Sequence, residues 1–164
     1  MEGGLEKLYD IYGTMTDCYG NLKLSALLYL AQDAAGEHCK ELSLDWDTMA
    51  QKQMFWAVIR HRVQITRLPK SGETVRIETW PMPTSRVAYP RSVVAYDEAG
   101  QEIFRAISLW CLMDAKSRAM VLPGKSGVMV EGTLRGNELA LPGSLAVRTM
   151  ENTISRQVLF SDLD

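Results

Sequence analysis

The chain has 164 residues, a length that suits one domain with or without a tail. Hydrophobic residues make up 46% of it and charged residues 23%, which is typical of a globular protein and excludes a disordered one. Lys and Arg number 18 against 20 Asp and Glu, so the net charge of -2 offers no basic surface for nucleic acid, and no apolar run approaches the roughly 18 residues that span a membrane.

The N-terminus and the cysteines favour a cytoplasmic location. The first ten residues, MEGGLEKLYD, lack the apolar stretch of a signal peptide. Cys18, Cys39 and Cys111 are scattered, with no Cys-x-x-Cys pair and no Cys/His cluster. We therefore expect free thiols in a reducing compartment, no metal site and no cofactor.

The first predicted elements are a strand and a long helix. Residues 8–15, LYDIYGTM, are typical of a strand and lead into a turn rich in Asp, Gly and Asn. Residues 22–42 place their polar side chains in a single stripe, which predicts a helix that is apolar over most of its circumference and buried on several sides. Residues 43–51 predict a short second helix, with Ser43 or Asp45 as its N-cap.

Four strand-like runs follow the helices. Their apolar residues alternate with polar ones, and the turns PKSG and DEAG separate successive runs. Pro90 interrupts the third run and predicts that this strand lies at an edge or contains a bulge. The four predicted strands cover residues 54–65, 73–80, 86–96 and 101–114.

This order of elements predicts an α+β domain with an antiparallel sheet. A long sheet wrapped around one apolar central helix is the hotdog fold, which we assign to residues 1–119. Gly and Pro recur at short intervals through residues 120–153, which predicts an ordered linker.

The last residues predict the start of a second domain. Residues 158–160 are apolar and strand-like, and Ser161 to Asp164 align with Thr16 to Tyr19 of the first domain. We therefore predict that residues 154–164 are the first strand of a truncated second hotdog domain.

Several segments in this order resemble the acyl-carrier-protein (ACP) thioesterases, a family of tandem double-hotdog enzymes. They are QDAAGEH in the predicted helix, ITRLPKSGETVRIETWP, the arginines before VVAYDEAG, and SLWCLMDAKSR, which is similar to the family's Ser-x-Trp-x-x-x-Asp-x-x-Ser/Thr-Arg. The resemblance implies hydrolysis of fatty acyl thioesters in fatty acid biosynthesis, with acyl-phosphopantetheine on acyl carrier protein as the substrate.

The resemblance also implies where the catalytic residues lie. The family's second hotdog opens with Ser-Asp-x-Asp-x-Asn-x-His, and Asp164 matches its catalytic Asp, whereas the Asn and His are not among the 164 residues. In the first copy, Tyr19, Asn21 and Lys23 stand at the Asp, Asn and His positions. A protonated lysine cannot replace a neutral imidazole as general base. We therefore expect this chain to supply the acyl pocket and to be inactive or nearly so by itself.

Candidate substrate-binding residues come from the helix, the sheet and two arginines. The helix and the inner sheet face should line an acyl cavity, with Leu27, Leu28, Ala31 and Trp56 as candidates. Arg86 and Arg91 are candidates for contacts with the carrier's phosphopantetheine or its acidic surface, and the alternative is that they are ordinary arginines of the sheet surface.

Two other functions remain open. A hotdog domain pairs with another to complete a sheet and a pocket, so a homodimer could bind acyl chains without cleaving them. A single-hotdog thioesterase or hydratase could instead use Asp33 or Glu37, which share the polar stripe, although a solvated or subunit-facing stripe is the favoured explanation of both. Of the two histidines, His38 is expected to be structural and His61 to lie on the surface.

Overall fold

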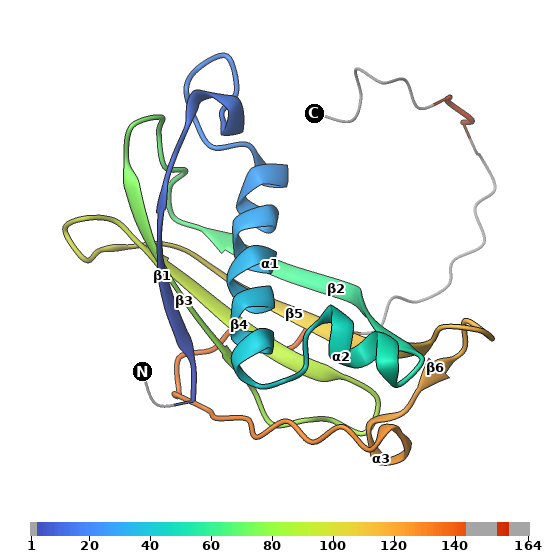
Figure 1. Cartoon of the computed structure of the whole chain (residues 1–164). Helices are drawn as coiled ribbons and strands as arrows, with labels where there is room; N and C mark the ends of the chain where they lie inside the picture. Colours follow the sequence, from blue (N-terminus) through green and yellow to red (C-terminus); the bar gives the residue numbers. More distant parts are fainter. Residues whose placement is uncertain (1–2, 144–153, 158–164) are drawn as a thin grey trace.

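An antiparallel sheet and one long helix form the body of the protein (Figure 1), and the computed structural model describes residues 3–143 and 154–157. The strand order is β1-β3-β4-β5-β2, with β6 on β5. The strands are β1 (Leu5–Asp10), β2 (Met54–Ile65), β3 (Thr74–Pro81), β4 (Tyr89–Tyr96), β5 (Glu102–Asp114) and β6 (Met120–Val121). The helices are α1 (Leu24–Glu41), α2 (Trp46–Gln51), α3 (Pro123–Ser126) and the 3-10 turn η1 (Gly13–Met15).

Helix α1 crosses one face of the sheet, and the main core lies between them (Figure 1). Leu27, Leu30 and Ala34 point from α1 into this core, where they meet Ile77 of β3 and Phe104 of β5. All five are fully or almost fully buried, and the polar stripe of α1 faces away from the sheet. This confirms the predicted hotdog fold, because the sheet wraps around one central helix. Among the described residues, no helix is both long enough and apolar enough to cross a membrane.

The N-cap of α2 confirms one of the two predicted caps. The Asp45 side chain accepts a hydrogen bond from the Thr48 backbone N–H at 2.9 Å, as an N-cap does. Ser43 instead takes a positive φ of 55° in the turn that separates the two helices.

The first strand begins and ends earlier than the sequence indicated. The prediction of residues 8–15 was wrong, because β1 covers Leu5–Asp10 and residues 13–15 form η1. β1 pairs only with β3 among the described strands, and Asp10 lies opposite Thr74, the first residue of β3. Ile11 adds one more pair of backbone hydrogen bonds, to Glu73 at 2.9 Å and from Gly72 at 2.8 Å, and the chain then turns into η1.

Pro90 lies in a central strand, so the prediction of an edge strand was wrong. β4 pairs with β3 on one side and β5 on the other, and its register shift falls at Ala95/Tyr96, away from the proline. The Pro90 carbonyl accepts from the Met82 N–H at 2.9 Å, just past the end of β3. In an antiparallel strand the N–H and the C=O of one residue point toward the same neighbouring strand. The N–H that Pro90 lacks would therefore point to a position where β3 has already ended.

After β6 and α3 the chain first lies beside the inner face, at Val128 and Val130, and then crosses to the outer face, at Arg135. We call residues 127–143 the strap (Figure 1). Val128 is buried beside Tyr89, and the Thr133 N–H donates to the Pro81 carbonyl at 3.0 Å. Farther along, the Arg135 guanidinium lies 3.9 Å from the centroid of the Trp80 ring. The described part of the predicted linker is therefore packed against the domain.

The predicted domain limits remain predictions. Residues 154–157 carry no regular secondary structure, and the strand expected at residues 158–160 lies outside the described residues, as does Asp164.

Substituting Gly132 with alanine is expected to detach the strap. A Cβ at this position would overlap the Met82 carbonyl group and the Pro83 nitrogen, which are backbone atoms that cannot move aside. We expect a loss of about 1–3 kcal/mol in unfolding free energy, as for other overpacked sites, measured by urea unfolding. Hydrogen exchange at the Thr133 amide should accelerate as well.

Gly124→Ala is the matched control, since a Cβ there meets nothing within 4 Å. Equal stability of the two variants would show that the close approach at Gly132 is not required.

Candidate functional site

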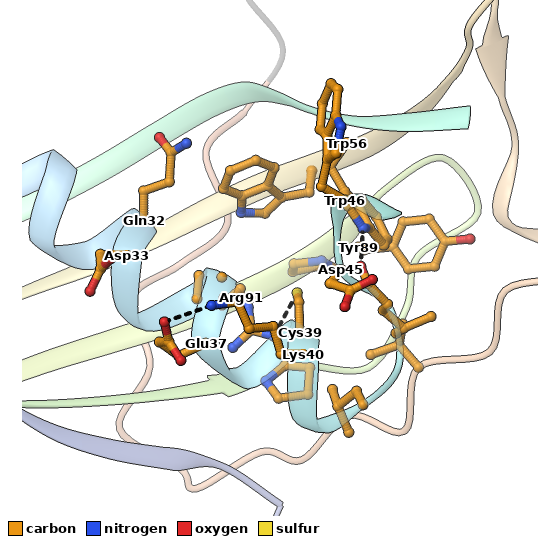
Figure 2. Close-up of a pocket in the computed structure, with 18 of the residues that line it drawn as sticks. Gln32, Asp33, Glu37, Cys39, Lys40, Asp45, Trp46, Trp56, Tyr89 and Arg91 are labelled. Atoms are coloured by element: carbon orange, nitrogen blue, oxygen red, sulfur yellow. Dashed lines mark hydrogen bonds and ion pairs between the residues drawn. The ribbon is translucent and has the colours of Figure 1, made fainter. Parts of the chain in front are cut away.

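A cavity of about 460 Å³ lies between the C-terminal half of α1, helix α2 and the inner face of the sheet (Figure 2). Such a volume is within the range of small-molecule sites. Its apolar walls come from elements far apart in the sequence: Leu42, Leu44, Trp46, Trp56, Pro81, Tyr89, Trp110 and Val130.

Aromatic side chains fix the shape of the apolar wall. The rings of Trp56 and Tyr89 meet edge to face, with centroids 5.0 Å apart and an interplanar angle of 87°. The Trp56 Nε1–H donates to the Leu44 carbonyl at 2.9 Å, and the Trp110 Nε1–H donates to Ser108 Oγ at 3.0 Å. Because the indole N–H groups are satisfied by the protein, the ring faces are left for apolar contact.

Arg91 lies on the inner face of β4, where the strand alternation also places Tyr89, and it reaches the cavity beneath α1 (Figure 2). Only 6% of Arg91 is exposed. Its Nη1 lies 3.1 Å from His38 Nδ1 and donates to Thr79 Oγ1 at 3.2 Å, and its Nη2 lies 4.0 Å from Cys39 Sγ. Arg91 and Cys39 of this cluster line the cavity, and we call the cluster the polar floor.

The polar floor fixes the protonation of His38. Arginine can only donate, so Nδ1 of His38 must accept, and the imidazole proton sits on Nε2. Burial and then the charge of Arg91 hold the pKa of His38 below its usual value, which keeps the ring neutral near pH 7. Burial also raises the pKa of the Cys39 thiol, and the nearby Arg91 opposes that rise only in part.

The predicted substrate-binding residues divide into two groups. Trp56 and Arg91 line the cavity, so the alternative of a surface position was wrong for Arg91. Leu27 and Ala31 are in the core beneath α1, and Leu28 packs against that core. Arg86 is exposed in the loop between β3 and β4. The roles assigned to these residues stay predictions.

The two carboxylates of the polar stripe are held by cations at the cavity rim. Asp33 accepts from Lys7 Nζ at 2.7 Å and from the Tyr9 hydroxyl at 2.8 Å. Lys7 holds the pKa of Asp33 below its usual value, and burial together with Asp33 raises the pKa of Tyr9. Glu37 pairs with Lys40 at 3.0 Å. A carboxylate with a lowered pKa is a weak general base, so Asp33 fits a structural role that ties α1 to β1.

Replacing Asp33 with asparagine is expected to lower the unfolding free energy by about 1 kcal/mol at pH 7, because the half-exposed Lys7 pair and the Tyr9 hydrogen bond weaken. The folded-state pKa of Asp33 lies below the unfolded one, so its contribution is present at neutral pH. That contribution is lost as the pH falls below about 4, and urea unfolding should show the two proteins converging there.

Glu98→Gln in the exposed turn before β5 is the control and should have the unfolding free energy of the original protein at pH 7. An Asp33→Asn difference that persists unchanged at pH 3 would contradict the prediction.

Three features of the cavity were not predicted from the sequence: the positions of Tyr89 and Trp110 in its wall, and the contact between His38 and Arg91. The alternation of β4 and β5 could have indicated that Tyr89, Arg91 and Trp110 share the inner face. Among residues 3–143 and 154–157, no group of three or more His, Cys, Asp or Glu side chains is placed to hold a metal ion.

Comparisons with known proteins identify the family. The sequence profile described as Acyl-ACP thioesterase N-terminal domain matches residues 4–122, which is most of the chain. The chain belongs to the acyl-ACP thioesterase family. An acyl-[acyl-carrier-protein] hydrolase of Cuphea viscosissima is 26% identical over 104 residues, and an oleoyl-acyl carrier protein thioesterase of Coriandrum sativum is 29% identical over 98 residues.

These matches cover 59% and 56% of this chain but only 25% and 27% of the two relatives. The matched part of the chain thus spans about a quarter of the length of each relative.

Solved structures support the hotdog fold of this family member. An acyl-ACP thioesterase from Bacteroides thetaiotaomicron aligns with a TM-score of 0.75 at 18% identity, covering 90% of this chain and 60% of the other. A 12:0-ACP thioesterase from Umbellularia californica aligns with a TM-score of 0.69 at 20% identity, covering 89% and 62%.

Proposed function

We propose that this chain acts in the hydrolysis of fatty acyl thioesters carried by acyl carrier protein, and that it contributes the cavity that holds the acyl group. The observation that carries the proposal is the aromatic and aliphatic cavity of about 460 Å³ in a domain of the acyl-ACP thioesterase family. An acyl chain gains free energy from transfer into such an apolar site.

We also propose that the 164 residues are not catalytic by themselves. Thioester hydrolysis needs a base that activates water, and the ionisable groups at the cavity are otherwise engaged. Asp33 and Glu37 are ion-paired, and His38, which is buried beside the cavity and does not line it, accepts from Arg91. Tyr19, at the position that the family resemblance gives to the catalytic Asp, is exposed in a turn and is not part of the cavity wall.

The proposed partner is acyl carrier protein with its acyl-phosphopantetheine arm. Arg86 is exposed and can meet an acidic surface, whereas buried Arg91 is accessible only to a group inside the cavity. Cys18, Cys39 and Cys111 carry free thiols, which supports a reducing compartment such as the cytoplasm.

Two measurements on the 164-residue chain test this function. We expect no turnover of acyl-ACP above the rate of spontaneous hydrolysis, together with binding of a non-hydrolysable acyl-pantetheine amide by calorimetry. Trp56→Ala should weaken that binding, because it removes an aromatic cavity wall. Sustained turnover would overturn the proposed lack of activity, and failure to bind the amide would overturn the acyl-binding role.

The alternative of an acyl-binding homodimer has one supporting observation. In the described part of the chain β2 pairs only with β5, so its second edge is open, and Val58, Ile59 and Ile65 on this strand are each about 40% exposed. Sedimentation of the original chain and of Ile59→Lys tests this. A dimer that the lysine dissociates supports edge pairing, and a monomer at all concentrations rejects it.

A further inference from the structure

The charge of Arg91 has no opposite charge beside it. The guanidinium remains protonated in proteins, and among the described residues no ion pair involves it. Its contacts are an imidazole, a hydroxyl and a thiol. Buried charges in proteins are almost always paired, because an uncompensated one costs several kcal/mol. An anion that enters the cavity would supply the missing partner.

The donors of Arg91 that its contacts leave available suit a carboxylate. Of five N–H donors, the contacts to His38, Thr79 and Cys39 use three at most. Nε–H and one Nη2–H remain, and Nε and Nη2 share one edge of the planar guanidinium. Two parallel donors match the two oxygens of a carboxylate, which is the geometry of bidentate arginine pairs.

The neighbouring groups hold this edge in position. Thr79 Oγ1 donates to the Ser92 carbonyl at 3.0 Å, so it can only accept from Arg91, and His38 Nδ1 accepts as well. Both Nη1 hydrogens are therefore fixed on the side away from the available edge. Such preorganisation favours binding, because the arginine is already ordered before a ligand arrives.

The acids that line the cavity do not neutralise Arg91. Asp33 and Glu37 are paired with Lys7 and Lys40, and Asp45 caps α2 through the Thr48 N–H. Asp45 keeps its negative charge, but none of the three carboxylates contacts Arg91, so the guanidinium charge at the floor has no ion-pair partner among the described residues. A monoanion balances that charge, whereas a phosphate would bring up to two negative charges to a site that holds a single guanidinium.

We propose that the cavity floor binds the carboxylate of an alkyl-chain acid, with Arg91 as its bidentate partner and the alkyl chain against Trp56, Tyr89 and Trp110. This inference rests on the proposed acyl-binding role of the cavity and names the ligand class. The carboxylate has two chemical sources: a free fatty acid, or an acyl chain that carries a second carboxyl group at its far end.

Calorimetry of the 164-residue chain with decanoate and decanol tests the site. We expect decanoate to bind at least tenfold more tightly than decanol. Arg91→Met should abolish that preference by weakening decanoate binding, and Arg91→Lys should keep part of it. Arg60→Met on β2, at a residue that does not line the cavity, is the matched control and should keep all of it. Equal binding of the two ligands, or a preference that survives Arg91→Met, would overturn the carboxylate site.

The outcomes separate this inference from the acyl-binding role. If decanol and decanoate bind equally, the apolar cavity stands and only the carboxylate site fails. If neither binds to the folded chain, both fail. Monomethyl decanedioate then distinguishes the sources: affinity at least equal to that of decanoate supports a carboxylated acyl chain, and affinity at least tenfold weaker supports a free fatty acid, provided that each depends on Arg91.

Discussion

Leu27→Ala is expected to lower the unfolding free energy by about 3 kcal/mol, the range of large-to-small changes in a packed core. Leu27 is completely buried between α1 and the sheet, where no solvent can fill the space that the lost atoms leave. Since Leu27 does not line the cavity, the folded fraction should bind the acyl-pantetheine amide with unchanged affinity. Urea unfolding and calorimetry measure the two effects separately.

Leu28→Ala is the matched control on the same helix. Leu28 is only partly buried, so we expect a loss of about 1 kcal/mol. If Leu27→Ala greatly weakened amide binding without a loss of stability, Leu27 would line the cavity. That result would contradict its assignment to the core.

Arg91→Met is expected to stabilise the chain by about 1–2 kcal/mol, because an apolar side chain of similar length replaces a buried and uncompensated charge. The change removes the hydrogen bonds to His38 and Thr79, each worth about 1 kcal/mol, but Thr79 keeps its bond to Ser92. The same variant should lose the preference for decanoate. Arg91 would then favour recognition of the carboxylate ligand and lower the stability of the folded chain.

The pKa of His38 provides a second readout of Arg91→Met. The positive charge of Arg91 is one cause of the lowered pKa, so its removal should move the pKa upward, while burial still holds it below about 6.5. In the original chain the folded state binds fewer protons at this site than the unfolded state, and stability falls as the pH drops below about 6.5. In Arg91→Met that fall should be shallower.

NMR titration of the His38 ring and urea unfolding between pH 5 and pH 8 measure these effects, and His61 is the internal control on the exposed strand β2. A destabilised Arg91→Met variant with an unchanged His38 titration would show that the arginine serves packing alone.

Local patterns predicted most of the fold. The predicted strand at residues 54–65 has the bounds of β2, and the long helix differs from α1 by about one residue at its C-terminal end and two at its start. The errors occurred where distant pairing decides the outcome. β1 ends where β3 begins, and Pro90 is tolerated in a central strand because β3 stops beside it.

The candidate site was harder to predict, because α1 is apolar on more than one side. Periodicity cannot tell which apolar side faces the core and which faces a cavity, so it does not separate the core residues Leu27 and Ala31 from a cavity residue such as Trp56. The cavity combines α1, α2, β4, β5 and the strap, whose mutual positions follow from the topology of the sheet. The environment of Arg91 depends on these contacts and has no local sequence signal.

The strand order has a consequence for folding kinetics. β3, β4 and β5 are neighbours in both the sheet and the sequence, whereas β1 and β2 join β3 and β5 across long stretches of chain. Closing a long loop costs more chain entropy than forming a hairpin, so we expect the three-stranded meander to form early and the two outer strands to dock later. Because β2 and the residues around it supply Trp56 and part of the cavity wall, the cavity is completed in a late step, after the strands that carry Arg91 and Trp110 have paired.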